Sequence, residues 1–91
     1  MRASRAAYGR EVIKWRLDQP KWVQIATELR ARIVAGVYKR GNPLPSERQL
    51  VDEFGVARAT VRKALAKLIE EGTIYTVFGI GNFVGPPPED D

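Results

Sequence analysis

The sequence contains no cysteine and no histidine. Without cysteine the chain forms neither disulfides nor thiolate metal sites, which suits a reducing compartment. Histidine is the commonest general base and metal ligand, so its absence argues against an enzyme. No run approaches the ~18 apolar residues of a membrane span, and no apolar stretch follows the basic N-terminus. We therefore expect no membrane anchor, no secretory signal, no metal and no cofactor.

Acidic residues are scarce in the first half of the chain. Residues 1–40 hold ten Lys and Arg against three acidic residues, whereas residues 41–85 hold five of each sign. The tail 86–91 is acidic. The 91 residues suit one small domain. A basic half indicates a polyanionic partner, with nucleic acid the leading class, although a solvated basic surface explains the charge equally well.

The first predicted helix follows a basic segment, residues 1–19, which suits either a short extra helix or a loose arm. An apolar stripe at helical spacing then predicts an amphipathic helix from residue 20 to about Gly36. We expect Arg30 and Arg32 to point away from that stripe. Its members are Trp22, Ile25, Leu29, Ile33 and Val37.

Two further helices are predicted after a turn-rich break at residues 39–45. Ser46 and Gln49 have the spacing of a capping box, and Gly55 is a natural stop for the short helix that they begin. A longer helix is predicted from about 57 to 71. Two helices joined by a glycine-containing turn form a helix-turn-helix pattern. The expected core comprises Leu29, Ile33, Leu50, Phe54, Val61, Leu65, Leu68 and Ile74.

The pattern then changes from helix to strand. Residues 73–78 are rich in β-branched and aromatic side chains, residues 79–81 form a glycine-rich turn, and residues 82–84 begin a return strand. The predicted fold is therefore mainly α with a small β-hairpin. Residues 85–91 are proline-rich and acidic, and we expect a solvated tail or the start of a linker.

The third predicted helix has the features of a helix that enters the major groove. Arg58 and Arg62 lie near its start, where the helix dipole disfavours positive charge unless a negative partner is present. Ala59 and Lys63 are expected on its outer face, opposite the apolar side. Arginine can donate two hydrogen bonds to the O6 and N7 acceptors of guanine. An ordinary basic surface helix is the plainer alternative.

These residues carry a family resemblance. Residues 20–84 resemble the winged helix-turn-helix DNA-binding domain of GntR-type bacterial transcription regulators. The elements that occur in family order and spacing are Pro45-Ser46-Glu47-Arg48, Gly55-Val56, Arg58-x-Thr60-Val61-Arg62, Ala64-Leu65, Glu71-Gly72 and Gly79-x-Gly81-x-Phe83-Val84.

The resemblance implies roles for individual residues. Arg48 and Arg58 correspond to the family's base-reading arginines, and Arg62 is similar to its third DNA-contacting arginine. Thr60 corresponds to a backbone-contacting hydroxyl, and Gly79 to a wing tip near the minor groove. Glu47 would orient neighbouring arginines or serve as a cap or solvated charge. The expected DNA-binding set is Ser46, Arg48, Arg58, Ala59, Thr60, Arg62, Lys63, Gly79 and Ile80.

The chain also departs from the family pattern. Ala57 cannot cap the third helix as a serine would, and Ala59 lacks a frequent hydroxyl. The predicted wing is apolar where basic residues are common, and Phe78 or Ile80 would pack on sugars or on another protein. The basic N-terminal segment would compensate by offering phosphate contacts from Arg2, Arg5 and Arg10.

The resemblance implies a cytoplasmic, nucleoid-associated regulator, most often a repressor, that binds double-stranded DNA. We expect two copies on an inverted-repeat operator. An effector small molecule is expected only through a further C-terminal domain, and we favour a DNA-binding fragment of a longer protein over a short free-standing regulator. The alternatives are a winged-helix protein-interaction module and a non-specific nucleoid-type DNA binder.

Overall fold

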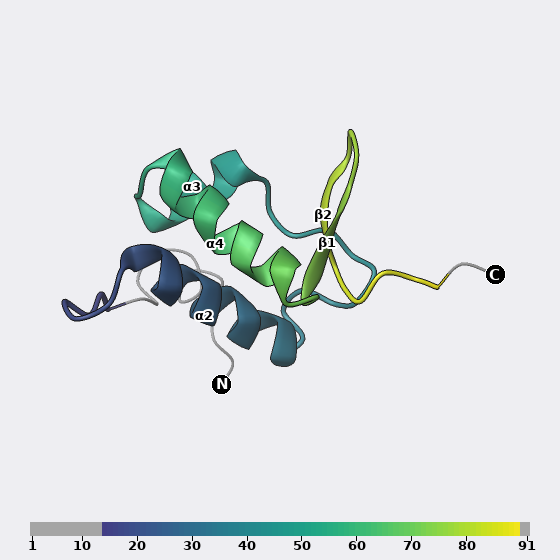
Figure 1. The fold of residues 1–91 in the computed structure, drawn as a ribbon, viewed down its shortest axis with the longest axis horizontal. Coiled ribbons are helices and arrows are strands. Elements are labelled where there is room, and N and C mark those ends of the chain that lie inside the picture. The colour runs from purple at the N-terminus through teal and green to yellow at the C-terminus, as the bar shows by residue number, and fades with distance from the viewer. Residues whose placement is uncertain (1–13, 90–91) are drawn as a thin grey trace.

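The computed structural model describes residues 14–89, and these residues form three helices and one hairpin (Figure 1). The helices are α2 (Lys21–Val34), α3 (Glu47–Phe54) and α4 (Arg58–Glu70). Strands β1 (Ile74–Val77) and β2 (Gly81–Val84) pair antiparallel. The predicted winged helix-turn-helix fold, mainly α with a small hairpin, is confirmed.

The predicted N-terminal extension is only partly described. Residues 14–20 form turns and irregular backbone with no helix among them. Trp15 packs partly against the core, whereas Leu17 is fully exposed. The expected phosphate contacts of Arg2, Arg5 and Arg10 lie outside the described residues.

The ends of α3 and α4 follow from local chemistry. The Gln49 backbone N–H donates to Ser46 Oγ at 3.1 Å, and the Ser46 N–H donates to Gln49 Oε1 at 2.8 Å, which confirms the capping box. Gly55 closes α3 with a φ of 67°, a left-handed conformation that glycine adopts without steric penalty. Ala57 precedes α4 and gives it no side-chain cap, as predicted.

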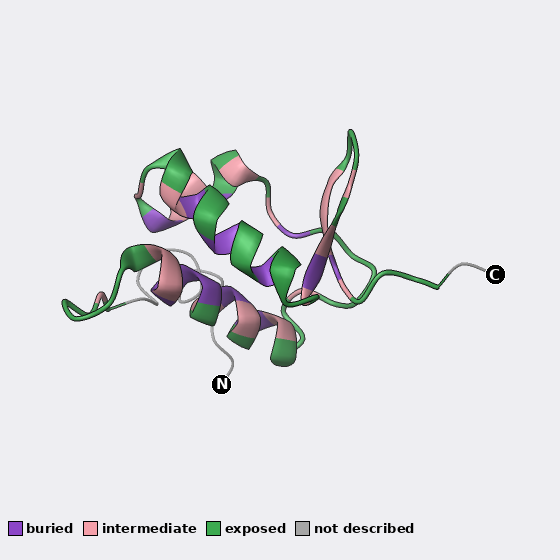
Figure 2. Ribbon diagram, in the orientation of Figure 1, coloured by how far each residue is buried: buried purple, intermediate pink, exposed green. Residues whose placement is uncertain are grey.

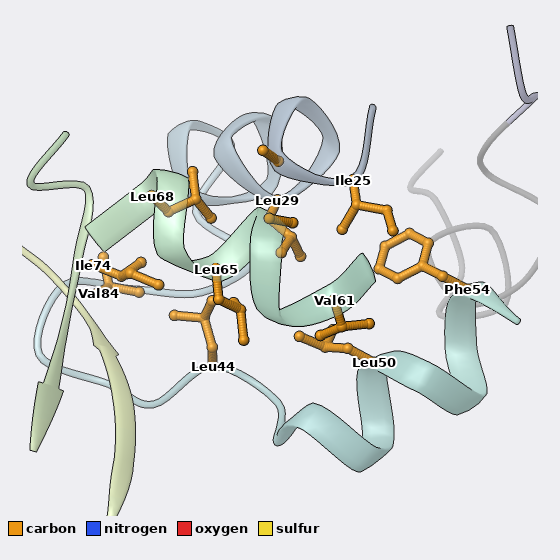
Figure 3. Packing of buried hydrophobic residues seen from close by; sticks show 12 residues of the cluster. Ile25, Leu29, Leu44, Leu50, Phe54, Val61, Leu65, Leu68, Ile74 and Val84 are labelled. Carbon is orange, nitrogen blue, oxygen red and sulfur yellow. The ribbon is translucent and has the colours of Figure 1, made fainter. Parts of the chain in front are cut away.

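The core lies where α4 packs against the other elements. Val61, Ala64, Leu65 and Leu68 form the buried side of α4, and α2, α3 and β1 all contact this helix. Figure 3 shows side chains from every element meeting around α4. The predicted core is buried except for Ile33, which packs only partly against it. Additional buried members are Ile25, Ala26, Leu44 and Val84.

Arg32 corrects the expectation that it points to solvent: its side chain is only 2% exposed. It lies three residues after Leu29 and therefore on the buried side of α2. Its Nε donates to Glu28 at 3.0 Å, its Nη1 donates to the Tyr38 hydroxyl at 2.6 Å, and its Nη2 donates to Glu53 of α3. Charged residues are buried in this way only when they are paired.

Burial and pairing act on Arg32 in opposite directions. Burial alone lowers the pKa of a guanidinium, but the hydrogen bonds to Glu53, Tyr38 and Glu28 outweigh it and raise the pKa of Arg32 above its usual value. Burial also raises the pKa of Tyr38. Arg32 therefore stays charged and joins α2 to α3. Val37 is a second correction, because α2 ends at Val34 and Val37 is exposed beyond it.

The hairpin is held to the body on two sides. Ile74 pairs with Val84, and both side chains enter the core. The loop before α3 runs beside β2: Leu44 N–H donates to Asn82 O at 2.9 Å, and Val84 N–H donates to Asn42 O at 2.9 Å. The predicted turn-rich break thus also supports the hairpin. Gly81, predicted as part of the turn, is the first residue of β2.

Candidate nucleic-acid interface

An open cleft of about 780 Å³ lies between the helix-turn-helix and the hairpin. Its walls come from the start of α3, the outer side of α4 and the tip of the hairpin, segments far apart in sequence. The structure brings together six members of the predicted set on this cleft. They are Ser46, Arg48, Arg58, Arg62, Gly79 and Ile80.

The outer face of α4 is open to solvent along its length. Its apolar side is buried, whereas Arg58, Ala59, Arg62, Lys63 and Ala66 are exposed. Figure 2 shows this alternation as buried and exposed patches on opposite sides of the α4 ribbon. A rigid helix that is anchored on one side and polar on the other can enter a groove of duplex DNA without losing its own packing.

Glu47 binds the arginines of α4 from the first turn of α3. The Nε of Arg62 donates to both carboxylate oxygens of Glu47, at 3.1 and 3.0 Å. The Nε of Arg58 lies 4.0 Å from Glu47 Oε1. The geometry therefore supports the orienting role among the alternatives for Glu47. Exposed ion pairs of this kind contribute only about 0–1 kcal/mol, so a stronger anionic partner can replace the carboxylate.

The guanidinium forks remain available for a ligand. Among the described contacts of Arg62 only Nε has an acceptor, so its two terminal nitrogens keep their donors. Arg48 is exposed and has no hydrogen bond or ion pair with other residues in the range 14–89. Ser46 uses its Oγ to cap α3. The cleft thus holds three exposed guanidinium groups and one carboxylate.

Ala59, Thr60 and Lys63 of the predicted set lie outside the cleft lining. Thr60 is half-buried, and Ala59 is exposed on the outer face of α4. The ammonium of Lys63 lies 5.1 Å from the centre of the Trp22 ring, on the side of α4 that faces α2. A cation over an aromatic face is attracted by the ring quadrupole. Trp22 therefore holds Lys63 toward the α2 side.

The hairpin tip adds apolar residues to the cleft. Phe78 lines the cleft beside Gly79 and Ile80 but was not in the predicted set. The predicted apolar wing did indicate that Phe78 would pack on sugars or on another protein, because no charged residue occurs between Thr73 and Gly85 and the turn at 78–80 has only apolar side chains. Gly79 has a φ of 80°, which allows the tight turn that projects the neighbouring side chains.

Two kinds of site do not occur among residues 14–89. No group of three or more acidic or other ligating residues is positioned to hold a metal ion. No helix in this range has the length and apolar character needed to cross a membrane.

Comparisons of the sequence and of the structure with known proteins both find bacterial DNA-binding regulators. Residues 21–84 match the family model described as bacterial regulatory proteins, gntR family. The chain is 43% identical over 68 residues to the HTH-type transcriptional repressor NagR of Bacillus subtilis, covering 75% of this chain and 28% of NagR. It is 42% identical over 66 residues to the Escherichia coli repressor MngR of the mannosyl-D-glycerate transport and metabolism system, covering 72% of this chain and 28% of MngR.

A solved structure of AraR(DBD) in complex with operator ORX1 superimposes with a TM-score of 0.73 at 34% identity, covering 80% of this chain and 92% of that one. The chain therefore belongs to the GntR family of bacterial regulatory proteins. It spans only about a quarter of the length of relatives such as NagR.

Proposed function

We propose that this member of the GntR family binds specific sites in double-stranded DNA and regulates transcription, as a repressor. The observation that carries the proposal is the convergence of Arg48, Arg58 and Arg62 on one cleft beside the exposed face of α4. Relatives such as NagR and MngR are named as repressors, and AraR(DBD) was solved in complex with an operator.

We propose that α4 enters the major groove. Arg58 is the first residue of α4, and Arg48 lies on the neighbouring helix α3. Both side chains line the same cleft, so both guanidinium groups reach toward one surface. In this arrangement they read guanine edges, while Arg62 leaves Glu47 and contacts DNA beside them. Ala59 is small enough to let the helix approach the bases closely.

Backbone contacts would come from the margins of this surface. Ser46 and Thr60 offer hydroxyl groups to phosphates, and Lys63 offers an ammonium that Trp22 positions beside α4. Gly79 and Ile80 approach the neighbouring groove from the hairpin. Contacts to phosphates fix the register of the protein on the duplex, and contacts to base edges supply the sequence preference.

We propose that two copies bind an inverted-repeat operator, since a two-fold arrangement of recognition helices matches a palindromic site. In this proposal residues 20–84 form the DNA-binding domain and residues 85–91 lead away from it. Binding of a small-molecule effector would belong to a further domain, and the site of action would be the cytoplasmic nucleoid.

Selection of bound sites from random duplex DNA tests the proposal. We expect a defined motif that contains guanine and recurs as an inverted repeat. The selection is repeated with Arg48→Ala/Arg58→Ala, which removes both proposed base readers, and we expect the motif to disappear. Binding without any enriched motif would indicate a non-specific nucleoid-type binder. No binding to duplex DNA would favour the protein-interaction alternative.

A further inference from the structure

The tip of the hairpin exposes two large apolar side chains. Phe78 is 98% exposed and Ile80 is 72% exposed, on either side of Gly79 in the turn that joins β1 to β2. Exposed apolar surface of this size is unfavourable in water, and a concentrated apolar tip indicates a contact surface. Figure 1 shows the hairpin extending away from the helices, so the tip is free to reach another molecule.

The tip belongs to the same cleft as the arginines of α4. Phe78, Gly79 and Ile80 line the wall opposite Arg58 and Arg62. A duplex that receives α4 in its major groove therefore presents its next groove to the hairpin tip. No residue from Thr73 to Gly85 is charged, so the hairpin has no cation with which to bind phosphates. The side chains of the turn itself, residues 78–80, offer a duplex only apolar atoms.

The geometry points to an apolar wedge: Phe78 and Ile80 enter the minor groove beside the α4 site, partly unstack a base step and bend the DNA. The inference rests on the proposed DNA-binding function and adds to it a mode of contact and a deformation of the operator.

The chemistry of the minor groove suits this pair of side chains. The groove is about 6 Å wide, which excludes a helix but admits the side chains of a narrow turn. Its walls are deoxyribose, which offers C–H surface rather than charge. Phenylalanine and isoleucine are among the residues that insert between base steps, and insertion kinks DNA by about 20–90°. Flexible pyrimidine–purine steps are unstacked most easily, so the wedge also favours such steps beneath the tip.

A protein partner fits the tip less well. A stable protein–protein interface buries about 800 Å² on each side, and two side chains on a narrow turn offer only a small part of that area. Beside the tip, Gly79 and Gly81 have no side chains and Val77 is half-buried, so the large exposed apolar side chains of the hairpin are confined to Phe78 and Ile80. The tip lacks the area for a protein interface, but it matches the dimensions of a groove.

The test compares DNA bending by wild-type protein and by Phe78→Ala/Ile80→Ala on the site recovered by selection. The duplex carries donor and acceptor dyes at its ends, and a second duplex carries 2-aminopurine beneath the expected tip position. The wild-type protein is expected to shorten the end-to-end distance and to increase 2-aminopurine fluorescence. The double variant is expected to do neither and to bind about 5- to 150-fold more weakly, the range for losing aromatic stacking on a base.

Two further variants separate the wedge from other effects. Val34→Ala removes a comparably exposed apolar side chain from α2, outside the cleft lining, and is expected to bind and bend as the wild type does. Phe78→Lys replaces the apolar contact with a charge, and is expected to lose bending while its binding becomes more salt-dependent by about one phosphate contact. Both positions are exposed, so neither change should unfold the domain.

The outcomes distinguish this inference from the proposed function. If selection recovers no site, the proposed sequence-specific function is wrong. If the wild-type protein binds its site without bending it, or the double variant bends it equally, the wedge alone is overturned. Concentration-dependent self-association that the double variant abolishes, measured by sedimentation without DNA, would also overturn the wedge and assign the tip to a second copy of the chain.

Discussion

Replacing Arg32 is the sharpest test of how α2 and α3 are held together. The side chain is 2% exposed, and its guanidinium donates to Glu28, Tyr38 and Glu53. Arg32→Ala removes the cation but leaves both carboxylates in place, with side chains only 18% and 16% exposed. Partly buried carboxylates without a counter-charge are strongly unfavourable.

The size of the effect follows from that imbalance. Breaking a buried ion pair by removing one partner costs about 3–5 kcal/mol, compared with about 5–15 kcal/mol for the total stability of a small protein. Arg30 provides a matched control two residues earlier on α2. Its ion pair with Glu71 is 38% and 28% exposed, and Arg30→Ala should cost at most about 1 kcal/mol.

Urea unfolding followed by far-UV circular dichroism measures both variants against the wild type. We predict that Arg32→Ala lowers the free energy of unfolding by about 3–5 kcal/mol, and Arg30→Ala by less than about 1 kcal/mol. Arg32→Met keeps an apolar stem but not the charge, and should remain close to Arg32→Ala. Equal losses for Arg32→Ala and Arg30→Ala would refute the reasoning. Full recovery in Arg32→Met would show that packing rather than charge is decisive.

Two other predictions concern α4 and its surroundings. The Arg30 guanidinium donates to Glu71 at 2.8 Å and holds the pKa of that carboxyl below its usual value. The pair therefore stabilises the fold fully above the unfolded pKa of about 4.3, and this contribution disappears as the pH falls through the folded pKa. NMR titration should show a higher Glu71 pKa in Arg30→Gln, and an unchanged pKa would contradict this cause. Ala57→Ser supplies the missing cap of α4 and should raise the free energy of unfolding by about 0.5–2 kcal/mol in urea titrations, whereas a loss of stability would show that the α4 start does not accept a cap.

Much of the fold could be predicted because its signals are local. The Ser46–Gln49 capping box, the stop at Gly55 and the apolar period of α4 each depend on residues within one or two turns. Helical spacing places Arg32 on the buried side of α2, but its burial as a charged group could not be predicted in this way, because one of its partners, Glu53, lies 21 residues along the chain. An arginine without that partner would belong at the surface.

The same distinction between local signals and contacts of distant residues applies to the candidate interface. Helical spacing was sufficient to place Arg58 and Arg62 on the exposed side of α4, and the resemblance added Arg48. The contacts of Lys63 with Trp22 and of Arg62 with Glu47 depend on how the helices pack, which periodicity does not specify.

The central claim, that the exposed arginines Arg48 of α3 and Arg58 of α4 read bases, is tested most directly by Arg58→Ala. Its affinity is measured on the selected site and on duplexes that differ from that site by one base pair at a time. We predict a loss of about 1–3 kcal/mol on the selected site, and loss of discrimination at one base pair only. Uniform weakening on every duplex, with all base preferences retained, would contradict the account and make Arg58 a phosphate contact.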